Sequence, residues 1–290
     1  MRGVAAQGTT SIEHEFERIV GEARDSEIIR RQLAAVRFYL HDVIEESTQG
    51  YAMEAGHGVT NYHALVDRIE RLVARGEHPV LYVTFNYDTL LERAISDTVI
   101  QGFPAINAYI SYQRRTLIKL HGSVNWRRKT DGLLAPLSGG QPQQNAEWLM
   151  DRFENIRLTR EYEVGLWHQF IIRQPVFLPA IAVPTEHKAI GDFELPEEHL
   201  NALRELLPRV DQVLVIGWRG HEDHFWELWH ECRPQPATMN VVVVAENQQA
   251  AGEVAGHLHG MGMSTRVEAA QARGFTGYLA EGGLPGLFLP

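Results

Sequence analysis

The pattern of apolar and polar residues predicts strands and helices that alternate along the chain. Continuous apolar runs at 80–83, 117–120, 212–217 and 240–245 have the length of buried strands, and a weaker run at 264–268 predicts a last strand. Strands that are apolar on both faces are typical of a parallel sheet covered by helices on both sides. We therefore expect an α/β fold built on a Rossmann-like parallel sheet.

Amphipathic spacing and end signals predict the helices. The first extends from Ser11 to about residue 46, with Ser11 as the N-cap and acidic residues in the first turn. The second covers 61–75 and ends before Gly76 and Pro79, which do not continue a helix. Further helices are expected at 88–96, 195–207, 222–231 and 248–259.

The stretch from about 101 to 207 interrupts this regular order. It contains a loop rich in Gly, Pro and Gln at 138–145, and short strand-like pieces at 176–178 and 181–183. The segment 146–174 is expected to be mostly helical, with two tryptophans as apolar anchors. We interpret the stretch as a helical insertion beside a nucleotide-binding core.

Composition and charge fit one globular domain that covers residues 1–290. Apolar residues make up 44% of the chain and charged residues 22%, and the net charge is −10. This negative charge argues against broad binding to nucleic acid. The basic clusters at 114–115 and 127–129 are interpreted as solvated loops.

Cysteine content and hydropathy suggest a cytoplasmic protein. Cys232 is the one cysteine, which excludes a disulfide framework and any zinc site built from several cysteines. No apolar stretch approaches the length of a membrane span, and residues 1–10 lack the layout of a signal peptide. We expect no membrane contact.

Two short strings carry the candidate chemistry. Thr-Phe-Asn-Tyr-Asp at 84–88 follows the first predicted strand, and Lys-Leu-His-Gly-Ser at 119–123 begins at the end of the second. Ligands of open parallel sheets bind beyond the carboxyl ends of the strands. We therefore expect Asn86, Asp88 and His121 to point into one crevice, where an amide, a carboxylate and an imidazole can act on a sugar.

Each of these residues also has a simpler interpretation. Asp88 and Thr89 could cap the following helix, and Thr-Leu-Leu-Glu at 89–92 has the form of a capping box. Asn86 could be a turn residue, and His121 could be a loop histidine whose hydrogen bonds are satisfied. The simpler interpretation is favoured for each residue alone, whereas the two strings together favour a site.

A longer series of motifs resembles one family. The two strings are followed by Val-Pro-Thr-Glu-His-Lys at 183–188, Val-Ile-Gly-Trp at 215–218 and Ala-Glu-Asn at 245–247. In this order the motifs resemble the sirtuin-like domain of bacterial NAD-hydrolysing defence effectors. The resemblance covers about residues 10–279, and its specific parts are Asn-Tyr-Asp at 86–88 and Leu-His-Gly-Ser at 120–123.

The resemblance implies a Rossmann-type domain that binds NAD as its substrate. Asn86 and His121 match the family's catalytic asparagine and histidine. Asp88 matches the acid that helps to hold the nicotinamide end. The implied reaction is NAD hydrolysis to nicotinamide and ADP-ribose, used in antiphage defence to deplete NAD.

The resemblance also implies where the rest of NAD would bind. Gly217 would lie against the adenosine half, and Glu246 or Asn247 would meet the adenine ribose. The other residues expected to line the NAD site are Thr84, Phe85, Gly122, Ser123 and Trp218. Activity would be held off until a trigger arrives, through a homo-oligomer or through a sensor or activator protein.

The chain departs from the family at two points. Protein-deacylating sirtuins carry a four-cysteine zinc module, so the single cysteine favours NAD cleavage and no zinc. The family begins with a strand and a loop of the Gly-Ala-Gly-x-Ser kind, and we expect this element to be absent, because Gly3 and Gly8 follow no predicted strand. The alternative function is therefore a non-catalytic subunit that binds NAD or ADP-ribose, or a scaffold.

Other chemistry is less well supported by the sequence. His221 and His224 are three residues apart rather than four, so they do not match a metalloprotease helix. No P-loop motif and no Gly-x-Ser-x-Gly elbow occurs. We predict no metal site.

Overall fold

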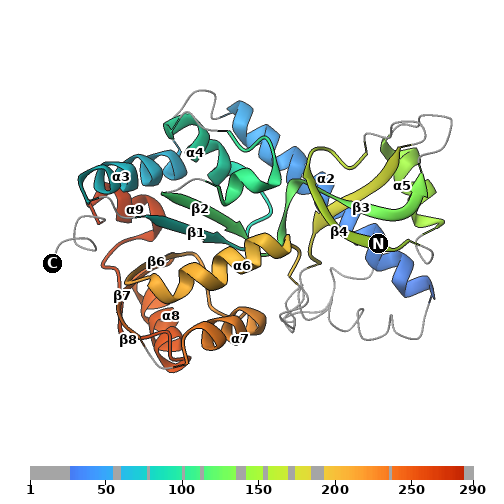
Figure 1. Cartoon of the computed structure of the whole chain (residues 1–290). Coiled ribbons are helices and arrows are strands. Elements are labelled where there is room, and N and C mark those ends of the chain that lie inside the picture. The colour runs from blue at the N-terminus through green and yellow to red at the C-terminus, as the bar shows by residue number, and fades with distance from the viewer. Residues whose placement is uncertain are drawn as a thin grey trace, which may run out of the picture.

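In the computed structural model, the chain forms two lobes of unequal size (Figure 1). The structure describes residues 27–54, 60–76, 79–99, 102–111, 114–134, 142–152, 156–168, 174–183, 193–234 and 237–283. The expected helix start at Ser11 and the expected glycine-rich loop region lie outside these residues, as does most of the motif at 183–188.

The larger lobe contains the parallel strands. Strand β1 (Val80–Thr84) pairs in parallel with β2 (Arg115–Lys119). A second parallel sheet has the order β6 (Gln212–Ile216), β7 (Ala237–Val244) and β8 (Ser264–Ala269). All five predicted strands are therefore confirmed, and the fold is α/β with parallel sheets flanked by helices.

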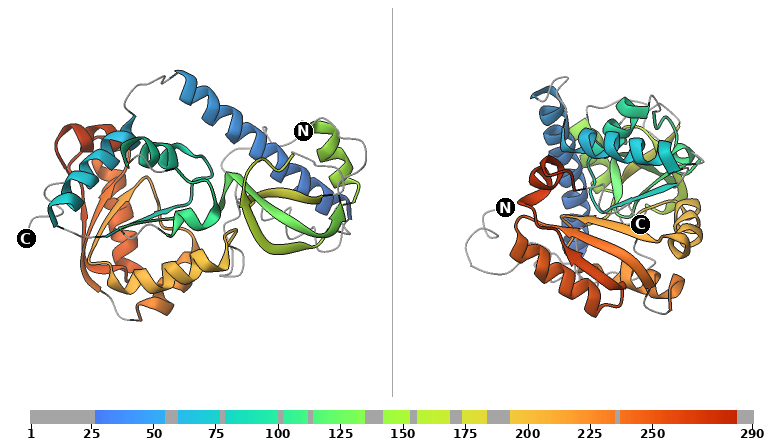
Figure 2. Two further views of the ribbon diagram at one scale, coloured as in Figure 1. Left: turned by 45° about the horizontal axis from the view of Figure 1, so that its top comes forward. Right: turned by 90° about the vertical axis from the view of Figure 1, so that its left-hand side faces the viewer.

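Helices lie on both sides of the parallel strands, as Figure 2 shows. Their bounds are α3 (Asn61–Gly76), α4 (Leu90–Val99), α6 (Glu197–Leu206), α7 (Asp223–Cys232), α8 (Gln248–Gly260) and α9 (Gly274–Ala280). One apolar core includes Leu117 and Ile118 of β2, Val241 and Val243 of β7, and Trp226 of α7. The two parallel sheets are thus joined by shared packing, which is the Rossmann-like arrangement expected.

The smaller lobe is built on an antiparallel sheet. Its central strand is β3 (Gly122–Leu134), which pairs with β4 (Leu158–Val164) on one side and β5 (Pro175–Ile181) on the other. Helix α2 (Glu27–Glu54) packs against β3 and β5 of this sheet, and helix α5 (Pro142–Met150) packs against α2. A second core gathers there, made of Phe38, Leu149, Trp167, Val176 and Leu178.

The expected helix over 146–174 is wrong beyond Met150, because residues 158–164 form β4. The charged residues Arg160, Glu161 and Glu163 of this segment are exposed, which suits an edge strand, and the segment pairs with β3. The predicted loop at 138–145 is also wrong from Pro142, where α5 begins. A proline is favourable at the first position of a helix because its missing N–H has no helical partner there.

The basic cluster at 127–129 lies on β3 and is not a solvated loop. Arg127 pairs with Glu163 at 2.7 Å and Lys129 pairs with Glu161 at 2.7 Å, both across to β4. Arg128 pairs instead with Glu194, with its Nη1 atom 3.1 Å from Glu194 Oε1. Cross-strand ion pairs explain how this charged segment forms a strand.

Helix α2 is longer at its C-terminal end than expected. It extends to Glu54 rather than to about residue 46, and within it Thr48 Oγ1 donates to the Ile44 carbonyl at 2.6 Å.

A buried histidine connects α6 to a short helical turn. His199 of α6 lies 2.9 Å from the carbonyl of Ile106, at the start of the short 3-10 helix η1 (Ile106–Tyr109). A second 3-10 turn, η4 (Leu207–Arg209), follows α6.

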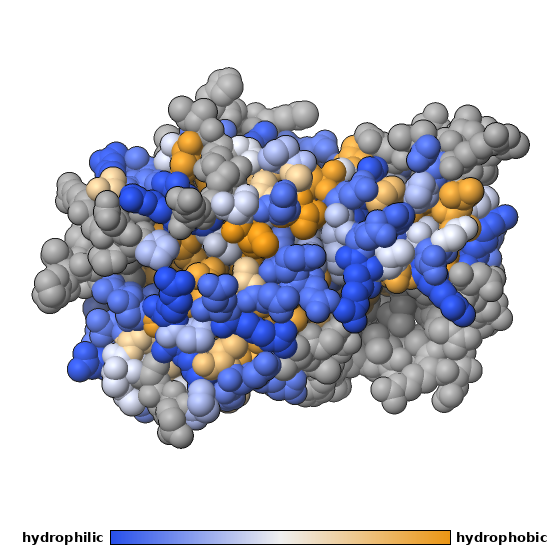
Figure 3. All heavy atoms as spheres, in the orientation of Figure 1, coloured by the Kyte–Doolittle hydropathy of each residue, from blue (hydrophilic) through white to orange (hydrophobic). Residues whose placement is uncertain are grey.

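The visible surface is mixed in polarity. Hydrophilic residues cover much of the face in Figure 3, and hydrophobic residues gather near its middle. Within the described part of the chain, no helix combines the length and apolar character needed to cross a membrane.

Candidate functional site

The two strings predicted to carry chemistry are joined through their backbones. The Leu120 N–H donates to the carbonyl of Thr84 at 3.1 Å, which continues the pairing of β1 with β2. The Val124 N–H donates to the carbonyl of Tyr87 at 2.9 Å. The parallel pair thus brings both strand ends to one edge and fixes one loop against the other.

Buried side chains of the string at 119–123 also bond to the backbone of the string at 84–88. Ser123 is fully buried, and its Oγ donates to the Tyr87 carbonyl at 3.2 Å. Lys119, also fully buried, donates from Nζ to the backbone carbonyl of Asp88 and lies 2.7 Å from Glu92 Oε1. Lys119 and Ser123 therefore hold the backbone of the first string in place.

The imidazole of His121 lies against the first string. Its ring stacks on Tyr87 with centroids 5.9 Å apart and meets Phe85 edge-on at 5.3 Å. These two aromatic residues flank Asn86 in the sequence, and Asn86 is exposed. His121 is 8% exposed, so the imidazole is held at the border between the core and the open strand ends.

Asn86 has a partner that the sequence did not indicate. Its Nδ2 donates to the hydroxyl of Tyr62, on α3, at 3.3 Å, and its backbone N–H donates to Thr84 Oγ1 at 3.1 Å. Burial raises the pKa of the Tyr62 hydroxyl, and the negative charge of Asp88 raises it further. Tyr62 lies on an ordinary amphipathic helix, so only the tertiary fold reveals this contact.

Asp88 contributes to the helix that follows it. Its Oδ1 accepts the backbone N–H of Leu90 at 3.0 Å, at the start of α4. Glu92 does not complete the capping box that the sequence suggests, because its carboxylate turns inward to Lys119. Asp88 is half-buried and therefore combines a capping role with a position beside the strand ends.

Gly122 is required by the packing beneath the site. Its φ is +79°, and a Cβ at this position would lie 1.9 Å from the carbonyl oxygen of Ala180. The same approach lets the Ala182 N–H donate to the His121 carbonyl at 2.9 Å. Close contact with the end of β5 thus fixes the backbone that carries the imidazole.

The end of β6 approaches the first string through aromatic contacts. Trp218 stacks on Phe85 with centroids 5.2 Å apart and planes inclined by 11°. Gly217, with φ +67°, is exposed and has no atom within 4 Å of the position of an added Cβ. The structure therefore brings Trp218 to the residues at 84–88 and leaves open space at Gly217.

Glu246 and Asn247 lie one strand further along. The Gly217 N–H donates to the carbonyl of Val244 at 3.0 Å, so the ends of β6 and β7 are adjacent. Glu246 is exposed, whereas Asn247 Oδ1 accepts the Ala250 N–H at 3.0 Å as the N-cap of α8. Both residues stand at the same edge as Gly217.

The sequence also missed His224, on the first turn of α7. Its Nε2 lies 3.2 Å from Nε2 of His121, and it is 1% exposed. Phe193 packs on the His224 ring with centroids 4.5 Å apart. Neither the spacing of His224 from His221 nor its place at the start of a predicted helix indicates a partner 103 residues away.

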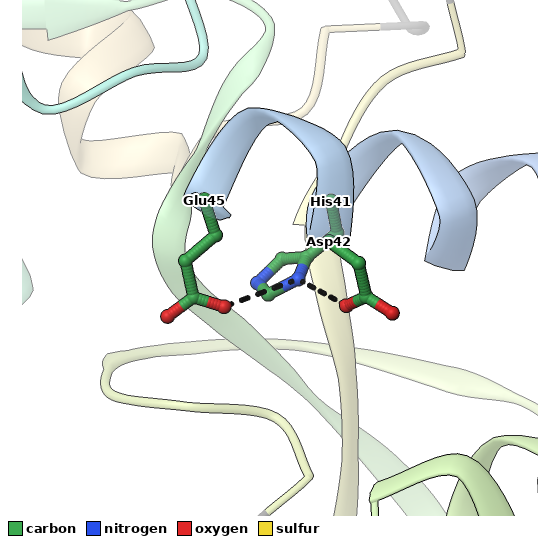
Figure 4. A group of neighbouring side chains, drawn as sticks. All are labelled: His41, Asp42 and Glu45. Carbon is green, nitrogen blue, oxygen red and sulfur yellow. Dashed lines mark hydrogen bonds and ion pairs between the residues drawn. The ribbon is translucent and has the colours of Figure 1, made fainter. Parts of the chain in front are cut away.

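One cluster elsewhere has the residue types of a metal site. His41, Asp42 and Glu45 on α2 lie together in Figure 4, with His41 Nδ1 3.1 Å from Asp42 Oδ1. His41 Nε2 contacts the Val124 carbonyl at 2.8 Å, and the indole Nε1 of Trp167 donates to His41 Nδ1 at 3.3 Å. Both ring nitrogens thus already make hydrogen bonds, and the group connects α2 to β3 and to the second core.

Two parallel sheets flanked by helices, with polar loops after the strands, define a Rossmann-like α/β class of protein. A family model for the SIR2-like domain matches residues 80–259, from the start of β1 into α8. The chain belongs to this SIR2-like family, whose members are generally NAD-dependent enzymes. A search of curated proteins gives no match.

Proposed function

We propose that this chain hydrolyses NAD to nicotinamide and ADP-ribose. The observation that carries the proposal is the contact of the His121 ring with Phe85 and Tyr87, the two neighbours of Asn86. An imidazole and a carboxamide are thereby held at one strand edge in a family that uses NAD as substrate.

The reaction breaks the bond between ribose C1′ and the nicotinamide nitrogen. The electron pair leaves with nicotinamide, which is already a cationic leaving group and needs no strong general acid. The ribose then has oxocarbenium character, as in glycoside hydrolysis, and a water oxygen bonds to C1′. The site must therefore hold the ribose, direct the water and accept its proton.

The proposed roles follow from the side-chain chemistry. Asn86 holds the ribose or the attacking water through its amide, and its hydrogen bond to Tyr62 restricts the amide orientation. His121, when neutral, accepts a proton from water or from a ribose hydroxyl. Asp88 orients the loop and the carboxamide of nicotinamide.

The other predicted site residues divide between support and binding. Ser123 and Gly122 are buried, so they support the loops. Thr84 positions the Asn86 backbone, and Phe85 with Trp218 gives a stacked aromatic wall. The open space at Gly217 and the exposed carboxylate of Glu246 suit the adenosine end, with Asn247 beside it.

The test is nicotinamide release from NAD by the purified chain at high protein concentration. We expect Asn86→Ala and His121→Ala each to lower kcat by about 100-fold or more. Asn107→Ala removes an exposed amide on η1 and should leave the rate unchanged. Undiminished release in Asn86→Ala would contradict the assigned role.

Binding without turnover would support a different function. If ADP-ribose and NAD bind to the chain but no nicotinamide is released, the chain is a non-catalytic binding or scaffold subunit. Zinc content would distinguish a third class, because a deacylase of the sirtuin type requires its zinc module.

We also propose that NAD cleavage serves antiphage defence. Free hydrolysis of NAD would harm the cell that makes the protein, so the activity suits a response that starts on infection. Assembly of several copies, or a sensor or activator protein, would supply the trigger. In cells challenged with phage, NAD should fall with the wild-type chain and remain steady with Asn86→Ala; equal NAD levels would argue against this role.

A further inference from the structure

We propose that His224 is a positioning residue for His121, and that it fixes which ring nitrogen of His121 carries the proton. The inference rests on the proposed function of His121 as a base. It starts from the 3.2 Å contact between the Nε2 atoms of the two rings, both of which are buried.

The direction of this hydrogen bond decides what His121 can do. In a neutral imidazole one nitrogen donates and the other accepts, so a contact between two Nε2 atoms needs one protonated and one bare nitrogen. If His121 donates, its Nδ1 is bare and can accept a proton. If His224 donates, the proton of His121 is on Nδ1, and no basic nitrogen is left for substrate.

A base at His121 therefore requires His224 to accept. His224 then carries its own proton on Nδ1, and the two rings adopt opposite tautomers. When His121 Nδ1 takes the proton from water or a ribose hydroxyl, its Nε2–H remains bonded to His224. His224, as the acceptor, stabilises the imidazolium that forms on His121, as the orienting carboxylate does in a catalytic triad, and His121 Nδ1 afterwards releases the proton to solvent.

Several contacts hold His224 in this position. The rings of His121 and His224 lie nearly parallel, with centroids 5.4 Å apart and planes inclined by 21°. Phe193 covers the His224 ring, and the next residue, Phe225, meets Phe85 edge-on at 5.7 Å. The hydrogen bond from Trp226 Nε1 to the Gly220 carbonyl, 2.7 Å long, fixes the loop before α7.

The placement also joins the two parallel sheets at the site. His121 follows β2, whereas His224 begins the helix after β6. A change in the distance between the two strand ends would alter the hydrogen bond directly. His121 is thus in the tautomer that can accept a proton only when the two parallel sheets are arranged as in this structure.

The first experiment uses NMR of the full chain labelled with ¹⁵N in its histidines, without NAD. Nitrogen chemical shifts distinguish protonated from bare ring nitrogens, and His121→Gln and His224→Gln assign the two rings. We expect His121 to be protonated on Nε2 and His224 on Nδ1. The reverse assignment, or the same tautomer in both rings, would overturn the proposal whether or not NAD is cleaved.

The second experiment measures steady-state NAD cleavage. His224→Phe removes the acceptor, and we expect kcat to fall about tenfold with KM little changed, which is the loss of one hydrogen bond. His224→Gln, whose carboxamide oxygen can accept, should recover most of this rate. His230→Phe, an exposed histidine on the same helix, is the matched control.

The two experiments separate failure of the inference from failure of the function. Absence of nicotinamide release from the wild-type chain would overturn the proposed reaction, while the NMR result would still decide the direction of the hydrogen bond. Unchanged kcat in His224→Phe, with active wild-type protein, would overturn the positioning role.

Discussion

Lys119, the last residue of β2, is a charged residue that lies in the core. The side chain has no exposed surface, and its ammonium group lies 2.7 Å from Glu92 Oε1 while it also donates to the Asp88 carbonyl. Tyr109 and Ser123 lie within 3.4 Å and 3.5 Å of the same carboxylate oxygen. Desolvation of both charges is offset only because they are paired and hydrogen-bonded.

We predict that Lys119→Met strongly destabilises the chain. Loss of the ammonium group leaves the buried Glu92 carboxylate without its counter-charge, which costs about 3–5 kcal/mol in the free energy of unfolding. Urea denaturation measures the effect, and adding Glu92→Gln to Lys119→Met should recover part of it. Lys129→Met breaks the more exposed pair with Glu161 and should cost less than about 1 kcal/mol. Equal losses in the two single variants would contradict the prediction.

At the scale of elements, β3 is the connection between the two lobes. It begins at Gly122, inside the candidate site, and pairs there with Ile181 of β5. It ends at Leu134, where it pairs with Pro175. Strand β5 continues through Pro179, which the edge position of β5 allows because an edge strand need not donate every N–H.

We predict that Gly122→Ala is far more harmful than Gly132→Ala on the same strand. Both glycines have positive φ, at +79° and +70°, so both variants incur a backbone cost of about 1–2 kcal/mol. Only at Gly122 would the new Cβ collide with a backbone carbonyl, at 1.9 Å, whereas nothing lies within 4 Å at Gly132. The additional loss should bring Gly122→Ala to at least about 3 kcal/mol. Thermal and urea unfolding of the two variants provide the comparison, and similar values would refute the packing argument.

In the part of the chain that the structure describes, two apolar cores hold three sheets and their helices together. Helix α2 carries Phe38 into the second core, and the network around His41 connects this helix to β3. In the larger lobe, one core spans both parallel sheets. His199 lies in this lobe beside Trp126 and Tyr109, where it connects α6 to η1.

We predict that acid weakens the fold through His199. Burial lowers the pKa of its imidazole to about 4, although its hydrogen bond to the Ile106 carbonyl and the charge of Glu198 oppose the shift. The folded state therefore disfavours the charged form. The stability that the neutral ring contributes is complete above the unfolded pKa of about 6.5 and is lost as pH falls towards 4, by about 3 kcal/mol.

The measurement is the free energy of unfolding between pH 7 and pH 4 for the wild-type chain and His199→Gln. The variant keeps a side-chain donor but cannot titrate, so its stability should fall less steeply over this range. Parallel pH profiles would show that His199 does not titrate as described.

Several features were predictable because they depend on local sequence. The continuous apolar runs of β1, β2, β6 and β7 pack in or against the core of the larger lobe, so the runs themselves identified these strands. The strings at 84–88 and 119–123 were expected at one edge, since parallel strands in one sheet end together, and β1 with β2 confirm this geometry. The direct contacts of His121 with Phe85 and Tyr87 came only with the structure.

Strand β4 and the long strand β3 could not be read from the sequence. Their charged residues are compatible with a strand only when each charge meets a partner on another strand, as Arg127 does with Glu163. The partners of the site residues share this difficulty. Tyr62 reaches Asn86 and His224 reaches His121 across 24 and 103 residues.

The α/β class, the parallel strands and the residue types at their ends could be predicted from the amino-acid sequence, because hydrophobic patterns and turn chemistry act over a few neighbouring residues. Three contacts became visible only in the folded chain: Lys119 is buried against Glu92, Gly122 meets Ala180, and His121 has a second imidazole as its partner. Such contacts depend on which distant segments pack together. Their energies come from burial and hydrogen-bond geometry, which no local pattern contains.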